Sequence, residues 1–130
     1  IGEVAEILKT PRYTMIPGVE PWMKGLANVR GRLLPISDMM MFLGRKSSVQ
    51  EHKRRVLVID HQEVFTGLTV DEVLGMQHFN IADYTMDVKA PFAEAAPFVQ
   101  GAFVRDGRTW YVLLLSRLIE DPRFLKAAIA

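Results

Sequence analysis

The sequence predicts a mainly β protein, built as a β-barrel or a pair of barrels, and three observations support this fold class. Short apolar segments recur along the chain and are separated by turns rich in glycine and proline. An Asp-Gly pair at residues 106–107 stands between two such segments, which is a strong hairpin signal. No helical pattern of about ten or more residues alternates with the strands, so a parallel α/β architecture is disfavoured.

The composition limits the classes of function. The chain has 130 residues, of which 49% are hydrophobic, and this is enough for the packed core of one domain. Its 16 basic and 15 acidic residues nearly cancel, so the surface as a whole is not suited to holding polyanions. The chain has no cysteine, which excludes disulfides, thiolate nucleophiles and zinc sites that need sulfur.

The sequence predicts neither a membrane-spanning segment nor a signal peptide. No apolar run approaches the roughly 18 residues that span a bilayer, and no signal-peptide pattern opens the chain. We therefore expect a soluble protein without membrane insertion. The chain starts with Ile1 inside a patterned segment, so we expect it to be a fragment of a longer protein.

The first quarter of the chain is less regular. Residues 1–10 carry apolar side chains at spacings that fit one face of a helix, but the segment is too short to separate a helix from a strand. Residues 11–21 are rich in proline, which predicts a loop, and Pro21 is placed to begin a helical turn.

Residues 26–36 are predicted to form one interrupted strand. Gly31 lies between two arginines, which predicts a bulge or a close approach of another backbone. Pro35 argues against a central position in a sheet, because proline cannot donate a ladder hydrogen bond. We therefore expect this strand to be bent and partly exposed.

Two hairpins are predicted further along the chain. The apolar segments at residues 56–60 and 64–70 are joined by a short polar loop, and those at residues 98–104 and 109–115 by the Asp-Gly turn. The other segments are predicted to be connections or short helices. They are a helix at residues 39–43 between an Asp38 cap and Gly44, a polar loop at 45–55, a β-like continuation at 71–76, a long loop with one helical turn at 77–97, a turn capped by Ser116, and a last helix from Asp121 to about residue 128.

No set of residues is typical of an enzyme. The three histidines are scattered and none has the i, i+4 spacing of a helical metal pair. No glycine-rich phosphate loop occurs. Asp71 and Glu72 alternate along a predicted strand, so their carboxylates point to opposite faces and are poorly placed as an acid and base pair. We therefore expect no enzymatic activity, no cofactor and no metal.

Two features indicate binding to another protein. Arg30 lies on the interrupted strand, where its guanidinium could make a bidentate contact with a partner's carboxylate, although spacing alone fits a solvated arginine equally well. The adjacent methionines at residues 39–41 cannot all face one way on a helix, so at least one is expected to be exposed to a partner.

Several segments together resemble the CheW-like adaptor family. They are V-x-E-I from Val4, a Pro-Gly loop, KGLANVRGRLLPISD from Lys24, VLVI from Val56, GLTVDEV from Gly67, and a final glycine, hairpin and strand from Gly101 to Leu115. The N-V-R-G-x-x-x-P-I-x-D portion is highly characteristic, and the match covers nearly the whole chain. The segments PRYTMIPGV, ANVRGRLLPI and VDEVLGMQHF resemble the members of this family from type IV pilus twitching-motility systems.

The resemblance implies a fold of two SH3-like five-stranded β-barrel subdomains with short helices. Residues 1–119 would form the CheW-like domain and residues 120–130 a C-terminal helix. Family members begin with two strands before the V-x-E-I segment, so the first subdomain is expected to lack about two strands. Because an unpaired sheet edge is a template for association, a strand-swapped or edge-paired homodimer is predicted.

The resemblance also implies a function and a site. The family couples methyl-accepting chemoreceptors to a CheA-type histidine kinase through its regulatory domain, without enzymatic activity, in the cytoplasm beside membrane-bound receptor arrays. Matching positions imply a receptor-tip groove near the start of the chain and a coupling surface around the N-V-R-G motif. The protein-binding residues so implied are Val4, Glu6, Ile7, Gly25, Asn28, Arg30 and Gly31.

Two alternatives remain open from the sequence. The chain could be the CheW-like regulatory domain of a CheA-type kinase or the adaptor part of a CheW-receiver fusion. It could instead be a nucleic-acid-binding β-barrel that uses the basic residues between Arg45 and Arg55. Against this last reading, no cluster of aromatic residues on one strand provides a surface on which bases would stack.

Overall fold

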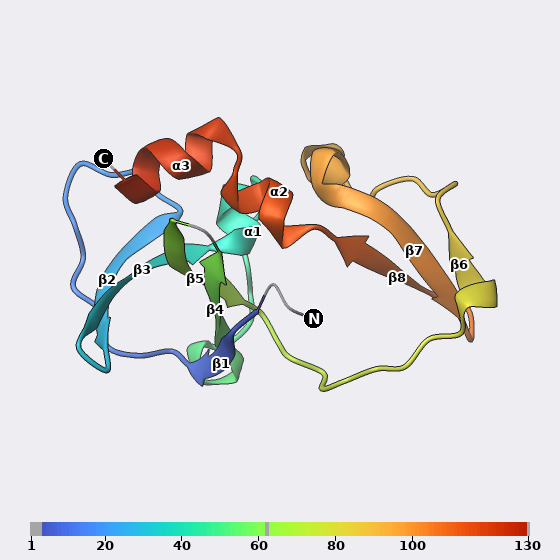
Figure 1. The fold of residues 1–130 in the computed structure, drawn as a ribbon, viewed down its shortest axis with the longest axis horizontal. Helices are drawn as coiled ribbons and strands as arrows, with labels where there is room; N and C mark the ends of the chain where they lie inside the picture. Colours follow the sequence, from blue (N-terminus) through green and yellow to red (C-terminus); the bar gives the residue numbers. More distant parts are fainter. Residues whose placement is uncertain (1–3, 62, 130) are drawn as a thin grey trace. The chain divides into compact units, whose positions relative to one another are not determined.

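The chain folds into two units, each built around one β-sheet (Figure 1). The computed structural model describes residues 4–61 and 63–129. The first unit comprises residues 1–73 and 122–130, and the second comprises residues 74–121. The helices are short, so the predicted mainly β class is confirmed.

The first unit contains a five-stranded sheet. Its elements in chain order are β1 (Glu6–Lys9), β2 (Met23–Val29), β3 (Arg32–Asp38), helix α1 (Met39–Phe42), the 3-10 helix η1 (Glu51–Lys53), β4 (Arg55–His61), β5 (Val64–Val70) and helix α3 (Pro122–Ile129). The strand order is β1-β4-β5-β3-β2, with β3 and β5 parallel and all other pairs antiparallel. The predicted hairpin of β4 and β5 is confirmed.

The predicted strand at residues 26–36 is in fact a hairpin of two strands. Val29 of β2 pairs with Arg32 of β3, which leaves Arg30 and Gly31 as a two-residue turn. Both have positive φ angles, 51° for Arg30 and 82° for Gly31, as the type I′ turns of hairpins require. The glycine therefore marks a turn rather than a bulge. Residues 22–24 also differ from the prediction, since Met23 begins β2 rather than continuing a helical turn.

Pro35 lies in an interior strand, contrary to the prediction. It pairs with Leu26 of β2, but the parallel ladder between β3 and β5 begins only at Ile36. Proline is tolerated because β3 has a single paired neighbour at that position, so no hydrogen bond to β5 is lost. On that side the hydroxyl of Thr66 donates to the Pro35 carbonyl at 3.3 Å.

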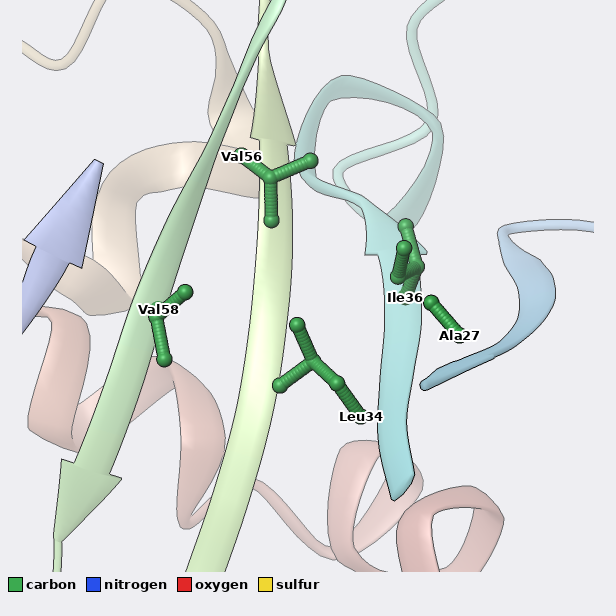
Figure 2. Close-up of a cluster of buried hydrophobic side chains, with 5 residues drawn as sticks. All are labelled: Ala27, Leu34, Ile36, Val56 and Val58. Carbon is green, nitrogen blue, oxygen red and sulfur yellow. The ribbon is translucent and has the colours of Figure 1, made fainter. Parts of the chain in front are cut away.

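The core of the first sheet consists of side chains from alternate positions of its strands, as the two-residue period of a strand requires. They are Ala27, Leu34, Ile36, Val56 and Val58, all at most 3% exposed. Figure 2 shows these side chains converging between β4 and the β2-β3 hairpin. Leu8, Val29 and Phe65 are partly buried and pack against this cluster.

A second cluster in this unit is aromatic and ties both helices to the sheet. Phe124 of α3 stacks on Trp22 at 5.5 Å between ring centres and meets Phe42 of α1 edge-on at 5.5 Å. Trp22 and Phe42 are 4.9 Å apart. The Asp38 cap and the positive φ of Gly44 at the ends of α1 agree with the prediction, and α3 confirms the last helix.

The second unit contains a three-stranded sheet with the order β6-β7-β8. Its elements are η2 (Ile81–Asp83), β6 (Tyr84–Thr85), η3 (Ala93–Phe98), β7 (Val99–Arg105), β8 (Arg108–Leu113) and α2 (Leu115–Ile119). The predicted Asp-Gly hairpin is confirmed, with positive φ at Asp106 and Gly107. Residues 71–76 form no strand, and Leu114 rather than Ser116 precedes the first turn of α2.

An arginine anchors the start of the second unit to its sheet. Arg105 donates to the His78 carbonyl at 2.8 Å and to Gln77 Oε1 at 3.2 Å, and its guanidinium lies 4.6 Å from the Phe79 ring centre. Phe79 in turn stacks on Phe103 of β7 at 4.9 Å.

The prediction that the first subdomain is short of strands is wrong, because among the described residues that unit has five strands and the second unit has three.

Candidate protein-binding site

Glu6 and Arg30 are brought together by the curvature of the five-stranded sheet. Glu6 lies on β1 and Arg30 follows β2, and these strands are the two edges of that sheet. Nevertheless, Arg30 Nη2 donates to Glu6 Oε1 in a salt bridge. Contact between opposite edges means that the sheet is rolled into a barrel, and this ion pair lies across its seam.

The turn that carries Arg30 is held by its neighbours in the motif. The Asn28 side-chain oxygen accepts a hydrogen bond from the Gly31 backbone N–H at 2.9 Å. Arg30 adopts a left-handed conformation that is unfavourable for a residue with a side chain. Three predicted residues, Asn28, Arg30 and Gly31, thus form one structural unit that projects the guanidinium outward, with 70% of the Arg30 side chain exposed.

Glycine is needed at residue 25 because another part of the backbone passes close to it. Thr14 and Leu26 exchange two backbone hydrogen bonds, of 2.8 and 2.9 Å. A Cβ atom on Gly25 would overlap the Thr14 carbonyl oxygen and lie 2.8 Å from its carbonyl carbon. Gly25 therefore permits the preceding loop to pair with β2, and it does not lie at the Arg30 turn.

Ile7 and Val4 do not share the position of Glu6. Side chains alternate along β1, so Leu8 packs against the core cluster on the side of Glu6 while Ile7 points to the opposite face, where it is 50% exposed. Val4 is partly buried just before β1. The structure thus places Glu6 with the Arg30 turn and separates Ile7 from it.

A groove of about 310 Å³ opens at this end of the barrel. All five strands, or the residues next to them, contribute to its lining: Ala5, Glu6, Val29, Arg30, Arg32, Val58, Asp60 and Phe65. The register explains this, because Glu6, Asp60 and Arg32 are on the same sheet face as the core and lie one step beyond it. We call this groove the barrel mouth.

The sequence did not lead us to expect Arg32, Asp60 or Phe65 in a protein-binding site. Arg32 Nη1 donates to Asp60 Oδ2 at 3.2 Å, and the guanidinium carbon lies 3.6 Å above the centre of the Phe65 ring. A signal was present in the sequence: once residues 30 and 31 are taken as a hairpin turn, the two-residue period puts Arg32 on the face of Leu34.

The two ion pairs of the barrel mouth are exposed to solvent and therefore weak. The side-chain exposures are 70% and 31% for Arg30 and Glu6, and 58% and 47% for Arg32 and Asp60. Ion pairs as exposed as these contribute at most about 1 kcal/mol, because water screens them. Either pair can therefore exchange for a contact with another protein at small cost.

The opposite end of the barrel is closed by a buried ion pair. Arg54, predicted to lie in a solvated basic loop, is only 8% exposed and donates to Asp38 Oδ2 at 2.9 Å. Asp71 and Glu51 lie farther from it, at 3.7 and 3.9 Å. Arg55 donates to backbone carbonyls of residues 52 and 54, at 3.0 and 2.8 Å. These two arginines are thus turned toward the protein itself.

The part of the chain that the structure describes holds neither a cluster of metal ligands nor a membrane-spanning helix. Within residues 4–61 and 63–129, no three histidine or acidic side chains are grouped so as to hold a metal ion. Over the same residues, no helix has the length and apolar character needed to cross a bilayer.

Comparison with known proteins agrees with this architecture. A family model described as "CheW-like domain" matches residues 1–123. Protein PilI of Pseudomonas aeruginosa is 47% identical over 129 residues, which cover 99% of this chain and 72% of that protein. Chemotaxis protein CheW of Thermotoga maritima is 24% identical over 121 residues, or 93% of this chain and 78% of that one.

A solved structure shows the same fold. The scaffolding protein TtCheW from Thermoanaerobacter tengcongensis superposes with a TM-score of 0.75 at 22% identity, over 94% of this chain and 83% of that one. The family model covers almost the whole chain. The matched residues include both sheets and the N-V-R-G turn. The chain belongs to the CheW-like domain family.

Proposed function

We propose that this chain is a non-enzymatic adaptor that couples a methyl-accepting chemoreceptor to a CheA-type histidine kinase. The observation that carries the proposal is the Glu6–Arg30 pair across the barrel seam. The motif arginine of this pair is exposed on a hairpin turn that Asn28 supports, a geometry suited to recognition of another protein. The pair is weak enough to be exchanged for a partner's charge.

The chemosensory system is proposed from the relatives. The 47% identity to PilI extends over 99% of this chain, which supports a role in controlling type IV pilus twitching motility. In such a system the adaptor would work in the cytoplasm beside membrane-bound receptor arrays. The nucleic-acid alternative is weakened by Arg54 and Arg55, whose guanidinium groups contact the protein itself.

Charge reversal at the turn tests the proposal. Arg30→Glu should sharply reduce co-purification of the cognate chemoreceptor fragment and of the kinase regulatory domain. The melting temperature should hardly change, because the Arg30 side chain is 70% exposed and its ion pair is weak. Unaltered recovery of both partners would contradict the proposal.

A charge swap separates recognition from a structural role. The double variant Glu6→Arg, Arg30→Glu restores an ion pair across the seam with reversed polarity. If Arg30 binds a partner, this variant should remain defective in binding. Recovery of binding in the double variant would show that only the intramolecular pair matters.

A further inference from the structure

We propose that Arg32 is a second recognition arginine, which binds a partner carboxylate at the barrel mouth and determines which segment is accepted there. The inference rests on the proposed adaptor function and extends it to a residue outside the N-V-R-G turn. The expected occupant is a protein segment that presents an Asp or Glu side chain next to an apolar one.

The geometry of Arg32 is that of a preorganised binding group. Its guanidinium carbon lies 3.6 Å from the Phe65 ring centre, so the aromatic ring supports one face of the planar group. Among the described residues only Nη1 has a hydrogen-bond partner, Asp60 at 3.2 Å. The side chain is 58% exposed, so an edge of the guanidinium fork remains open to a carboxylate.

The exposures of the charged groups favour an anionic partner. In both ion pairs at the barrel mouth the arginine is more exposed than its carboxylate, 70% against 31% and 58% against 47%. A partner that approaches from solvent therefore meets positive charge first. Asp60 then acts as an intramolecular competitor that occupies Arg32 in the free protein.

The groove between these charges explains the apolar part of the expected segment. Ala5, Val29 and Val58 contribute to its lining, and its volume is about 310 Å³. This volume suits one or two side chains rather than a whole helix. Apolar contact there would exclude water and strengthen the neighbouring charged hydrogen bonds.

Three variants test the inference by titration calorimetry against two purified probes, the cytoplasmic fragment of the cognate chemoreceptor and the regulatory domain of the cognate kinase. Arg32→Lys keeps the charge but removes the planar fork. It should weaken binding of the probe that supplies the acidic segment by about tenfold. Asp60→Asn frees Arg32 and should tighten binding of the same probe by about twofold to fivefold. Lys53→Ala, an exposed cation before the other end of β4, is the control and should leave both affinities unchanged.

The opposite signs at Arg32 and Asp60 make the inference falsifiable. Weakened binding in Asp60→Asn would mean that the carboxylate itself recognises the partner, which overturns the inference. So would unchanged affinities in Arg32→Lys with an intact melting transition. Either result leaves the adaptor function standing if the wild-type protein binds both probes, whereas failure of the wild-type protein to bind either probe contradicts both proposals.

Discussion

Replacing Asp38 by asparagine would measure the contribution of the buried ion pair that closes one end of the barrel. The Asp38 carboxylate has two roles: Oδ1 accepts from the Met41 backbone N–H as the cap of α1, and Oδ2 accepts from Arg54. Asparagine is as good a helix cap as aspartate, so Asp38→Asn removes the charge and keeps the cap. Asp38→Ala removes both.

The expected magnitude follows from the burial of the pair. The Arg54 and Asp38 side chains are only 9% and 4% exposed, and breaking a buried pair by removing one partner costs about 3–5 kcal/mol. Asp71 and Glu51 remain within 4 Å of Arg54, so we expect the low end, about 3 kcal/mol, for Asp38→Asn. Loss of the cap should add about 1 kcal/mol in Asp38→Ala.

Urea denaturation followed by tryptophan fluorescence would measure these losses in the first unit alone. Trp22 lies in the first unit and Trp110 in the second, so a Trp110→Phe background leaves Trp22 as the reporter. With a slope of about 2 kcal/mol per M urea, Asp38→Asn should lower the midpoint by about 1.5 M.

A double variant provides the control. Asp38→Asn with Arg54→Met leaves no unpaired buried cation, so it should be more stable than Asp38→Asn alone. The reasoning is refuted if Asp38→Asn costs less than about 1 kcal/mol, or if the double variant is less stable than the single one.

Three other expected outcomes follow from the fold, two from substitutions and one on the oligomeric state. Gly25→Ala should lower the free energy of unfolding by more than about 2 kcal/mol, because the new Cβ would meet the Thr14 backbone. Gly31→Ala should lower it by only about 1 kcal/mol, because its Cβ meets open space and only the positive φ is unfavourable. Equal losses in urea denaturation would contradict this. Phe124→Ala should cost about 3–5 kcal/mol in the same assay, since this fully buried ring joins Trp22 to Phe42, and a loss below about 1 kcal/mol would mean that α3 does not pack there. An edge-paired homodimer is expected from light scattering, because β8 is an outer strand of the three-stranded sheet, and a monomer mass at all concentrations would exclude it.

Much of the local structure was predictable because its signals lie within a few residues. The hairpins β4-β5 and β7-β8 follow from apolar runs separated by short polar turns. The short helix α1 follows from the Asp38 cap and the glycine at residue 44. Turn chemistry and helix capping depend on neighbouring residues, so the sequence carries them directly.

The Arg30 turn shows where local reasoning was insufficient. Arg-Gly is not among the common type I′ pairs, so the segment was predicted to be a strand with a bulge. Pairing of Val29 with Arg32 made it a hairpin, and Asn28 supplies the side-chain hydrogen bond that supports the turn. The motif residues were found by family resemblance, whereas their geometry required the structure.

By itself, the sequence determined the mainly β class, most of the strands and the residues of the N-V-R-G motif. Only the tertiary structure decided that Arg54 is buried, that Glu6 meets Arg30 across the barrel seam, and that Arg32 and Asp60 share a groove with Phe65. The physical reason is that these contacts depend on strand order and sheet curvature. Both arise from pairing between residues far apart in the chain, which no local pattern specifies.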